Sequence, residues 1–195
     1  MSIDIKQIEK NYELKEDFEI ERIATSNSKG LRPEVYKIIE NEIKKRNLNP
    51  NLLNGVISQN REYSLDELKF YSDYLRNLSC PKCKNRTQKL NGTISYTIKS
   101  FILFTSKEAK TSVACPSCLI KKNNEAILIC ILLGWWSIPW GLLQTPYYIF
   151  KNFNSKNQTK NKDSNFALLN FVNNNIGYIE SYKDDIDKLK KIINQ

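Results

Sequence analysis

Four of the five cysteines are arranged as two C-x-x-C pairs, a spacing that is typical of metal sites. The short spacing lets both thiolates of a pair reach one ion, and two pairs supply the four sulfurs that suit a tetrahedral Zn²⁺ ion at about 2.3 Å each. Four protein ligands leave no open position for water, so we expect a structural rather than a catalytic zinc ion. The predicted metal ligands are Cys80, Cys83, Cys115 and Cys118.

Other uses of these cysteines stay open at this stage. An iron site with four sulfurs would use the same ligands, and two buried thiol pairs or a redox C-x-x-C would fit the same residues. A redox motif needs a βαβ context and one active pair, so two Cys-Pro-x-Cys pairs favour one shared ion. Residues 1–10 mix both charges and lack an apolar core, which predicts no secretory signal and a reducing compartment. Cys130 lies among Leu and Ile and is expected to be a small buried apolar residue.

The residue types argue against an enzyme. The sequence has no histidine, so it contains no Ser-His-Asp triad, no Cys-His nucleophile pair and no imidazole metal ligand. It also lacks a phosphate-binding loop, a dinucleotide fingerprint and a nucleophile elbow. The acidic cluster of Asp184, Asp185 and Asp187 fits the solvated start of a helix, where carboxylates are favoured by the helix dipole. We therefore expect a non-enzymatic protein.

A long uncharged segment follows the second cysteine pair. Residues 126–150 carry no charge, and 18 of these 25 residues are apolar. As one helix the segment would extend about 37 Å, enough for a hydrocarbon core of about 30 Å. Pro139 lies between two glycines and should kink or interrupt such a helix. The residues that we expect at the membrane are Trp135, Trp136, Pro139 and Trp140.

Lysines flank both ends of this segment, at Lys121 and Lys122 before it and from Lys151 after it. Basic residues prefer the cytoplasmic side, so we expect both ends, and the ribbon, at the cytoplasmic face of the membrane. A re-entrant hairpin or a helix lying in the interface satisfies this pattern. A single kinked transmembrane helix stays open, and a buried helix pair in a soluble core ranks second.

The same residues resemble a known group of proteins. A C-x-x-C…C-x-x-C module, then residues 134–141 (GWWSIPWG), then Thr145-Pro146, is similar to an uncharacterised group of bacterial zinc-ribbon membrane proteins. Those carry a G-W-W-x-x-P-W-G signature just after the second knuckle. The resemblance covers residues 75–152 and implies a zinc ribbon next to a membrane-embedded segment. It implies no activity, and it does not explain the N-terminal helices or the tail.

Positive charge is concentrated around the cysteines, because residues 80–125 carry nine basic and only two acidic side chains. Such clusters attract phosphate on anionic lipid headgroups or on nucleic acid. A general abundance of lysine in the chain explains them equally well. In the nucleic-acid hypothesis, Tyr96, Phe101 and Phe104 would stack on bases. The residues expected to bind an anionic partner are Lys82, Lys84, Arg86, Lys89, Lys121 and Lys122.

Helices are predicted on both sides of the cysteine pairs. Pro33 begins one helix, and Ser64 with Glu67 forms a capping box that begins another. Asn54-Gly55 is typical of a turn between them. A last helix is expected from about Ser181, and the apolar residues before it should dock on the N-terminal helices or on a second copy of the chain.

The region between the cysteine pairs is predicted to be a β-hairpin. Residues 93–105 are dense in β-branched and aromatic residues, which favour a strand. Asn91-Gly92 suits a tight turn before it, and residues 112–114 a short returning strand. A hairpin accommodates the long spacing between the pairs because it returns the chain to its starting point.

These observations predict an α+β fold: a small β zinc ribbon flanked by N-terminal amphipathic helices, by a hydrophobic kinked helix or helical hairpin, and by a C-terminal helix. The predicted regions are N-terminal helices in 1–79, the ribbon in 80–125, the membrane-associated segment in 126–150, a linker in 151–165 and C-terminal helices in 166–195. The leading hypothesis is a non-enzymatic membrane-associated adaptor that binds lipid and either an unidentified protein or a second copy. The alternative is a soluble ribbon that binds nucleic acid.

Overall fold

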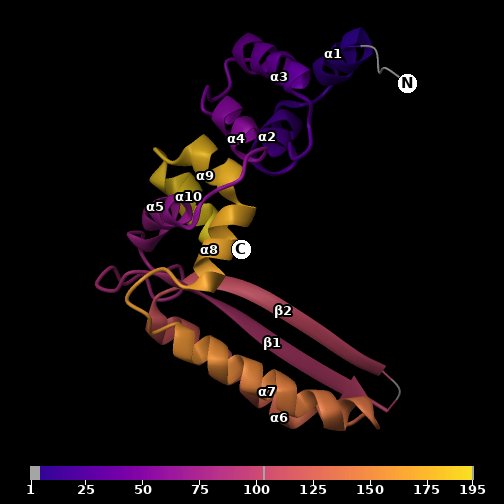
Figure 1. The fold of residues 1–195 in the computed structure, drawn as a ribbon, viewed down its shortest axis with the longest axis vertical. Helices are drawn as coiled ribbons and strands as arrows, with labels where there is room; N and C mark the ends of the chain where they lie inside the picture. Colours follow the sequence, from indigo (N-terminus) through magenta and orange to yellow (C-terminus); the bar gives the residue numbers. More distant parts are fainter. Residues whose placement is uncertain (1–4, 103, 195) are drawn as a thin grey trace. The chain divides into compact units, whose positions relative to one another are not determined.

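The computed structural model describes residues 5–102 and 104–194. Within these residues it contains ten helices and one antiparallel β-hairpin (Figure 1), so the predicted α+β class is confirmed. The chain divides into two compact units. The first unit comprises the chain up to Tyr71 together with 172–189, and the second comprises 72–171 with 190–195.

The first unit is helical. Its core contains the fully buried side chains of Ile20, Ile39, Leu52 and Val56. Its helices are α1 (Ile5–Glu13), α2 (Asp17–Ser26), α3 (Pro33–Lys45), α4 (Leu52–Ser58), most of α5 (Leu65–Arg76), the end of α8 (Phe166–Asn174), α9 (Ile176–Tyr182) and the start of α10 (Ile186–Ile193).

Two helix starts occur where the sequence predicts them. Pro33 is at the first turn of α3, where a missing N–H group leaves no hydrogen bond unmade. At the start of α5, the backbone N–H of Ser64 donates to Glu67 Oε2 at 2.9 Å, and the N–H of Glu67 donates to Ser64 Oγ at 3.3 Å. The predicted capping box is therefore confirmed.

The tail packs on the N-terminal helices through a close contact between α4 and α9. A Cβ atom at Gly55 would lie 2.1 Å from Ser181 Oγ and 2.7 Å from the carbonyl oxygen of Gly177, so only glycine allows this approach. Gly55 thus lies inside α4, and the predicted Asn54-Gly55 turn is wrong because tertiary packing overrides the local turn preference. The predicted docking of the tail on the N-terminal helices is confirmed for α9.

The second unit is built on a long hairpin. Strand β1 (Asn91–Phe101) pairs with β2 (Phe104–Ala114) over eleven residue pairs, from Asn91 opposite Ala114 to Phe101 opposite Phe104. Asn91-Gly92 begins β1 instead of forming a turn. The range 93–105, predicted as one strand, is divided between β1 and β2, and the returning strand is longer than the predicted 112–114. The predicted hairpin between the cysteine pairs is therefore confirmed, with a longer second strand than the sequence indicated.

Two helices, α6 (Pro116–Leu133) and α7 (Trp140–Gln158), lie side by side along β1 (Figure 1). They are joined by residues 134–139, which we call the corner. Gly134 makes the corner close, because a Cβ there would lie 2.4 Å from Thr145 Oγ1 and 2.5 Å from the carbonyl oxygen of Cys130. The glycine–tryptophan–proline motif therefore forms a turn between two packed helices, and the predicted helical hairpin is the observed form of the segment.

The expected transmembrane helix is corrected by the structure: among the described residues, no helix is both long enough and apolar enough to cross a membrane. The reason is the corner, which divides the uncharged segment between two helices. The remaining half of each helix carries charges, at Lys121, Lys122 and Glu125 in α6 and at Lys151 and Lys156 in α7.

Buried asparagines attach α7 and the chain after it to β1. Asn152 Oδ1 accepts from the N–H of Tyr96 at 2.9 Å, and Asn152 Nδ2 donates to the carbonyl oxygen of Tyr96 at 2.7 Å. Asn165 Nδ2 likewise donates to the carbonyl oxygen of Gly92 at 2.7 Å. The segment predicted as a linker from residue 151 instead continues α7 to Gln158, because these amides hydrogen-bond to the free edge of β1.

Candidate metal centre and apolar surface

The first cysteine pair lies in a tight turn. The N–H of Cys80 donates to the carbonyl oxygen of Asn85 at 2.9 Å, and the N–H of Lys84 donates to the carbonyl oxygen of Cys80 at 2.9 Å. Lys84 closes this turn with a φ of 60°, in the left-handed region. The sequence prediction gave Lys84 a role in binding anions; in the structure its backbone shapes the cysteine turn.

The second pair lies at the start of α6. Cys115 is the N-cap residue, Pro116 follows at the first turn, and Cys118 is one turn into the helix. The unpaired N–H groups and the dipole at a helix N-terminus favour negative charge, so this position suits thiolates. The hairpin connects the two pairs, since β1 begins soon after the first and β2 ends directly before the second.

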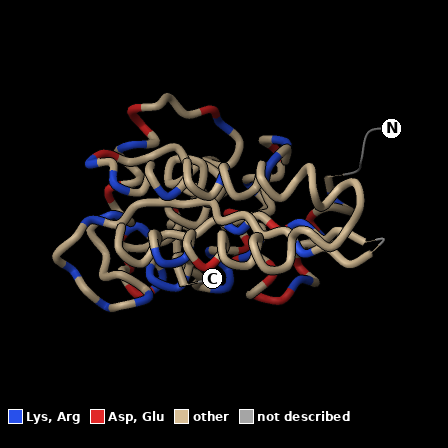
Figure 2. Tube along the Cα trace, turned by 90° about the horizontal axis from the view of Figure 1, so that it is seen from below, with Lys and Arg blue, Asp and Glu red and all other residues tan. Residues whose placement is uncertain are grey.

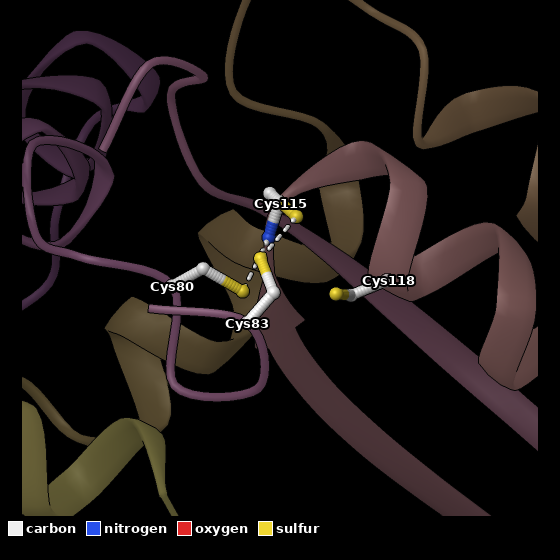
Figure 3. A group of neighbouring side chains, drawn as sticks. All are labelled: Cys80, Cys83, Cys115 and Cys118. Carbon is white, nitrogen blue, oxygen red and sulfur yellow. Dashed lines mark hydrogen bonds between the residues drawn. The ribbon is translucent and has the colours of Figure 1, made fainter. Parts of the chain in front are cut away.

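The four sulfur atoms converge on one space (Figure 3), and all lie within 4.8 Å of one another. Cys83 Sγ is 3.6 Å from Cys115 Sγ, too far for a disulfide, whose sulfurs are about 2.05 Å apart. Sulfurs bound tetrahedrally at about 2.3 Å are about 3.8 Å apart, which agrees with this separation. The predicted ligands are thus confirmed as a group that could hold a metal ion.

The surroundings lower the pKa of the Cys80 thiol and raise the pKa of the Cys115 and Cys118 thiols. Burial alone would raise the pKa of Cys80, but N–H groups of Cys115 and of its own turn donate to its sulfur and lower its pKa to about 6. Burial raises the pKa of Cys115 and of Cys118, and hydrogen bonds between the Cys118 thiol and neighbouring sulfurs raise the pKa of Cys118 further. Four thiolates therefore need a cation between them, which is the chemistry of a metal site.

Lysines lie beside this cluster. Lys82, Lys121 and Lys122 line a cavity of about 460 Å³ that also touches Cys83 and Cys118. The other predicted anion-binding residues, Lys84, Arg86 and Lys89, are exposed on the loop after the first pair and do not line this cavity. The structure adds Lys110 from β2, which the sequence analysis did not select although it lies five residues before Cys115.

The opposite end of the hairpin has an exposed apolar surface. The corner lies beside the end of the hairpin, where Ile102 bridges to Ser137 and Thr105 Oγ1 lies 2.8 Å from Ser137 Oγ. Large side chains project here with most of their surface exposed, including Ile102 at 81% and Ile138 at 82%. We call this surface the apolar tip; it comprises Phe101, Ile102, Phe104, Trp136, Ile138 and Trp140.

The sequence predicted only part of this tip. Trp136 and Trp140 are exposed as a membrane contact requires, whereas Trp135 is less exposed and Pro139 forms part of the corner. Phe101, Ile102 and Phe104 were not predicted at the membrane. The sequence signal for these residues was their position at a hairpin turn. Turns normally contain Gly, Asn, Asp or Pro, so large apolar residues there indicate a contact with an apolar partner.

Exposed apolar residues continue from the tip along the outer faces of α6 and α7. They include Leu128 and Leu132 on α6, and Leu143, Tyr147 and Phe150 on α7. Residues 126–150 contain no charged side chain, and in Figure 2 long stretches of the chain are tan, without the blue or red of charged residues. A patch of this kind indicates contact with an apolar partner.

Comparison with known proteins gives no match: neither protein-family models, nor curated proteins, nor solved structures show significant similarity to this chain. The resemblance to bacterial zinc-ribbon membrane proteins therefore depends on the cysteine pairs and the corner motif alone. Of that resemblance, the structure bears out the four clustered cysteines.

Proposed function

We propose that this protein is a non-enzymatic, membrane-associated zinc-ribbon protein that acts as an adaptor at the cytoplasmic face. The single observation that supports this most strongly is the apolar tip at the end of the hairpin. In this proposal, the metal closes one end of the hairpin and the other end enters the lipid interface without spanning it.

Zinc is the ion that this ligand set suits best. Cys₄ sites with two C-x-x-C pairs are typical of structural zinc, and four thiolates fill its tetrahedral coordination. When bound, the ion would compensate the thiolate charges and hold the ends of β1 and β2 together. Cys80, Cys83, Cys115 and Cys118 would be its ligands.

Charge complementarity favours lipid as the occupant of the tip. Lys99 is two residues above Phe101 on β1, and Lys107 is three residues above Phe104 on β2. At about 3.3 Å per residue, these lysines are about 7–10 Å from the end of the hairpin. Interfacial segments bury their apolar residues about 5–10 Å deep. The two ammonium groups therefore lie at the level of phosphate headgroups when the tip is inserted.

The aromatic composition of the tip supports the same occupant. Tryptophan is enriched where membrane meets water, because its ring is apolar and its N–H can still be satisfied. Trp136 meets this condition, since its Nε1 donates to the carbonyl oxygen of Leu132 at 2.9 Å while 67% of the residue is exposed.

Vesicle binding tests this proposal with a site-specific signal. All three tryptophans, Trp135, Trp136 and Trp140, lie in or next to the corner, so tryptophan fluorescence, excited selectively, reports on this part of the chain only. We expect the metal-loaded protein to sediment with vesicles and its emission to shift to shorter wavelength. Both effects should be larger with phosphatidylglycerol present than with phosphatidylcholine alone, because of Lys99 and Lys107.

A variant at the end of the hairpin can remove apolar side chains of the tip while leaving all three tryptophans in place as the fluorescent reporters. Burying one large apolar side chain contributes about 1.5–3 kcal/mol, so the double variant Phe101→Ser/Phe104→Ser should weaken vesicle binding at least about tenfold. The matched control is Phe18→Ser/Phe70→Ser, at positions that are 65% and 61% exposed in the first unit. Sedimentation without vesicles is the remaining control. A stable oligomer that already shields the tryptophans would contradict the proposal, and so would the absence of binding to both kinds of vesicle.

A further inference from the structure

A second site lies at the metal end of the hairpin. The cavity of about 460 Å³ beside Cys83 and Cys118 is lined by four lysines from three elements. Lys82 comes from the first cysteine turn, Lys110 from β2, and Lys121 and Lys122 from α6. Its size is within the range of about 300–1,000 Å³ that is usual for small-ligand pockets.

The four ammonium groups have no carboxylate partners in the described part of the chain. None of the ion pairs found there includes them, although Glu125 also lines the cavity. Burial lowers the pKa of Lys122, and the charges of Lys110 and Lys82 lower it further, while Glu108 and Glu125 oppose this. Lys122 Nζ donates to Ser112 Oγ on β2, which keeps the ammonium group at the wall of the cavity.

The metal centre accounts for only part of this charge. Four thiolates around one Zn²⁺ ion carry a formal charge of about −2. Among the groups that line the cavity, the four lysines exceed that charge and Glu125 by one positive charge, which is left for a ligand; Glu108, which also acts on Lys122, does not line the cavity. A cavity with several donors and excess positive charge suits a compact oxyanion, because each ammonium group supplies three donors.

Lipid headgroups at the inserted tip are distant from this cavity. Lys110 pairs with Ser95, six residue pairs from the Phe101–Phe104 end of the hairpin. That separation is about 20 Å along the strands at about 3.3 Å per residue, whereas an interfacial segment enters only about 5–10 Å. The two lysines near the tip, Lys99 and Lys107, and the four lysines of the cavity therefore face different surroundings.

We infer that this cavity binds the phosphate group of a small soluble ligand, held by Lys82, Lys110, Lys121 and Lys122 beside the metal centre. This site is separate from the membrane contact and adds a second ligand to the proposed function. Because the cavity also touches Cys83 and Cys118, we expect the ligand to bind the metal-loaded protein.

Titration of the metal-loaded protein with inorganic phosphate and with pyrophosphate tests this inference. The readouts are calorimetry and amide shifts in a ¹H–¹⁵N spectrum, against chloride at equal ionic strength. We expect saturable binding, tighter for pyrophosphate, with shifts confined to residues around the cavity. The double variant Lys110→Gln/Lys122→Gln should weaken binding at least tenfold, and the exposed single variant Lys121→Gln should weaken it less.

The variant Lys99→Gln/Lys107→Gln is the matched control, because it removes the same charge from the hairpin at the other end. It should keep phosphate binding and lose the preference for phosphatidylglycerol vesicles, whereas the cavity variant should show the reverse. If neither anion binds, or if only oligonucleotides do, the inference is wrong. None of these outcomes affects the membrane proposal, which depends on the tip.

Discussion

At the scale of residues, the cysteines differ in how their surroundings prepare them for a metal. Cys80 and Cys115 are both buried, but backbone N–H groups lower the pKa of Cys80, whereas burial raises the pKa of Cys115. Cys83 is exposed and Cys118 half-buried, so these two complete the site from the side that faces solvent. Cys130, the fifth cysteine, is buried as the sequence predicted, and its thiol contacts the carbonyl oxygen of Tyr96 at 3.4 Å.

Single replacements of the cysteines test these roles. Cys83→Ser and Cys118→Ser should each reduce bound zinc from about one equivalent to almost none, because a Cys₄ site needs all four ligands. Cys130→Ala should retain the metal, since its sulfur lies outside the cluster. Metal content by mass spectrometry measures this, and the thiolate absorption of a Co²⁺-substituted sample confirms the ligand type. Metal loss in the Cys130 variant equal to that in the others would contradict the assignment.

Tyr182 gives a pH dependence in the first unit. Its hydroxyl donates to Glu21 Oε2 at 3.2 Å, and burial together with the charge of Glu21 raises the pKa of Tyr182 above its ordinary value of 10. In the unfolded chain the hydroxyl of Tyr182 loses its proton near pH 10, whereas in the folded chain it still holds the proton at that pH. The stability from this group is therefore fully present below pH 10 and is lost as the pH rises further.

Tyr182→Phe should reduce this alkaline loss of stability. At neutral pH the variant should lose about 0.5–1.5 kcal/mol with the hydrogen bond to Glu21. Above pH 10 the difference between the two proteins should become smaller, because phenylalanine has no proton to lose. Urea unfolding at a series of pH values measures both effects, and a constant difference across the series would exclude the proposed linkage.

At the scale of elements, the side chain of Asn152 hydrogen-bonds to the edge of β1, where a third strand would otherwise pair. The hairpin has two strands, so the outer edge of β1 presents unpaired N–H and C=O groups. Asn152 on α7 pairs with both groups of Tyr96 and also contacts the sulfur of Cys130 at 4.0 Å. The helical hairpin is thereby fixed on β1 in one register, which places the corner beside the end of the strands.

Asn152→Ala should therefore destabilise the second unit. Removing the amide leaves the N–H of Tyr96 without its acceptor, at about 1–3 kcal/mol, and leaves its carbonyl oxygen with only the weak thiol donor of Cys130. Asn154→Ala is the control, because Asn154 is exposed on the same helix and should cost less than about 0.5 kcal/mol. Denaturant unfolding followed by tryptophan fluorescence reports on this unit, since all three tryptophans belong to it. Equal stability of the two variants would show that Asn152 has no such role.

At the scale of the whole molecule, the two units depend on different forces. The first has an apolar core of helical side chains, and the second combines a hairpin, two helices and the cysteine cluster. A metal ion can contribute about 10–16 kcal/mol to a small unit of the second kind. Unfolding should consequently show two transitions, and the metal should affect one of them.

Removal of the metal with a chelator should lower the melting temperature of the second unit by about 20 °C or more. The helical circular dichroism of the first unit should keep its own transition, because the cluster lies outside it. Thermal scans that follow tryptophan fluorescence and far-UV circular dichroism on the same sample separate the two. An equal shift of both signals would mean that the units unfold together.

Local chemistry in the sequence was sufficient for several features. The two C-x-x-C pairs predicted the cysteine cluster, because the spacing within each pair already brings two sulfurs close together. The capping box that begins at Ser64 predicted the start of α5, and Pro33 predicted the start of α3. Tertiary structure alone decided the rest. Gly55 is helical because α9 packs against it where a side chain would be, and Lys110 lines one cavity with Lys121 and Lys122 because α6 packs back on the hairpin. The tip exists because Asn152 and Gly134 hold the corner next to the hairpin end, and such contacts between distant residues leave no short-range pattern.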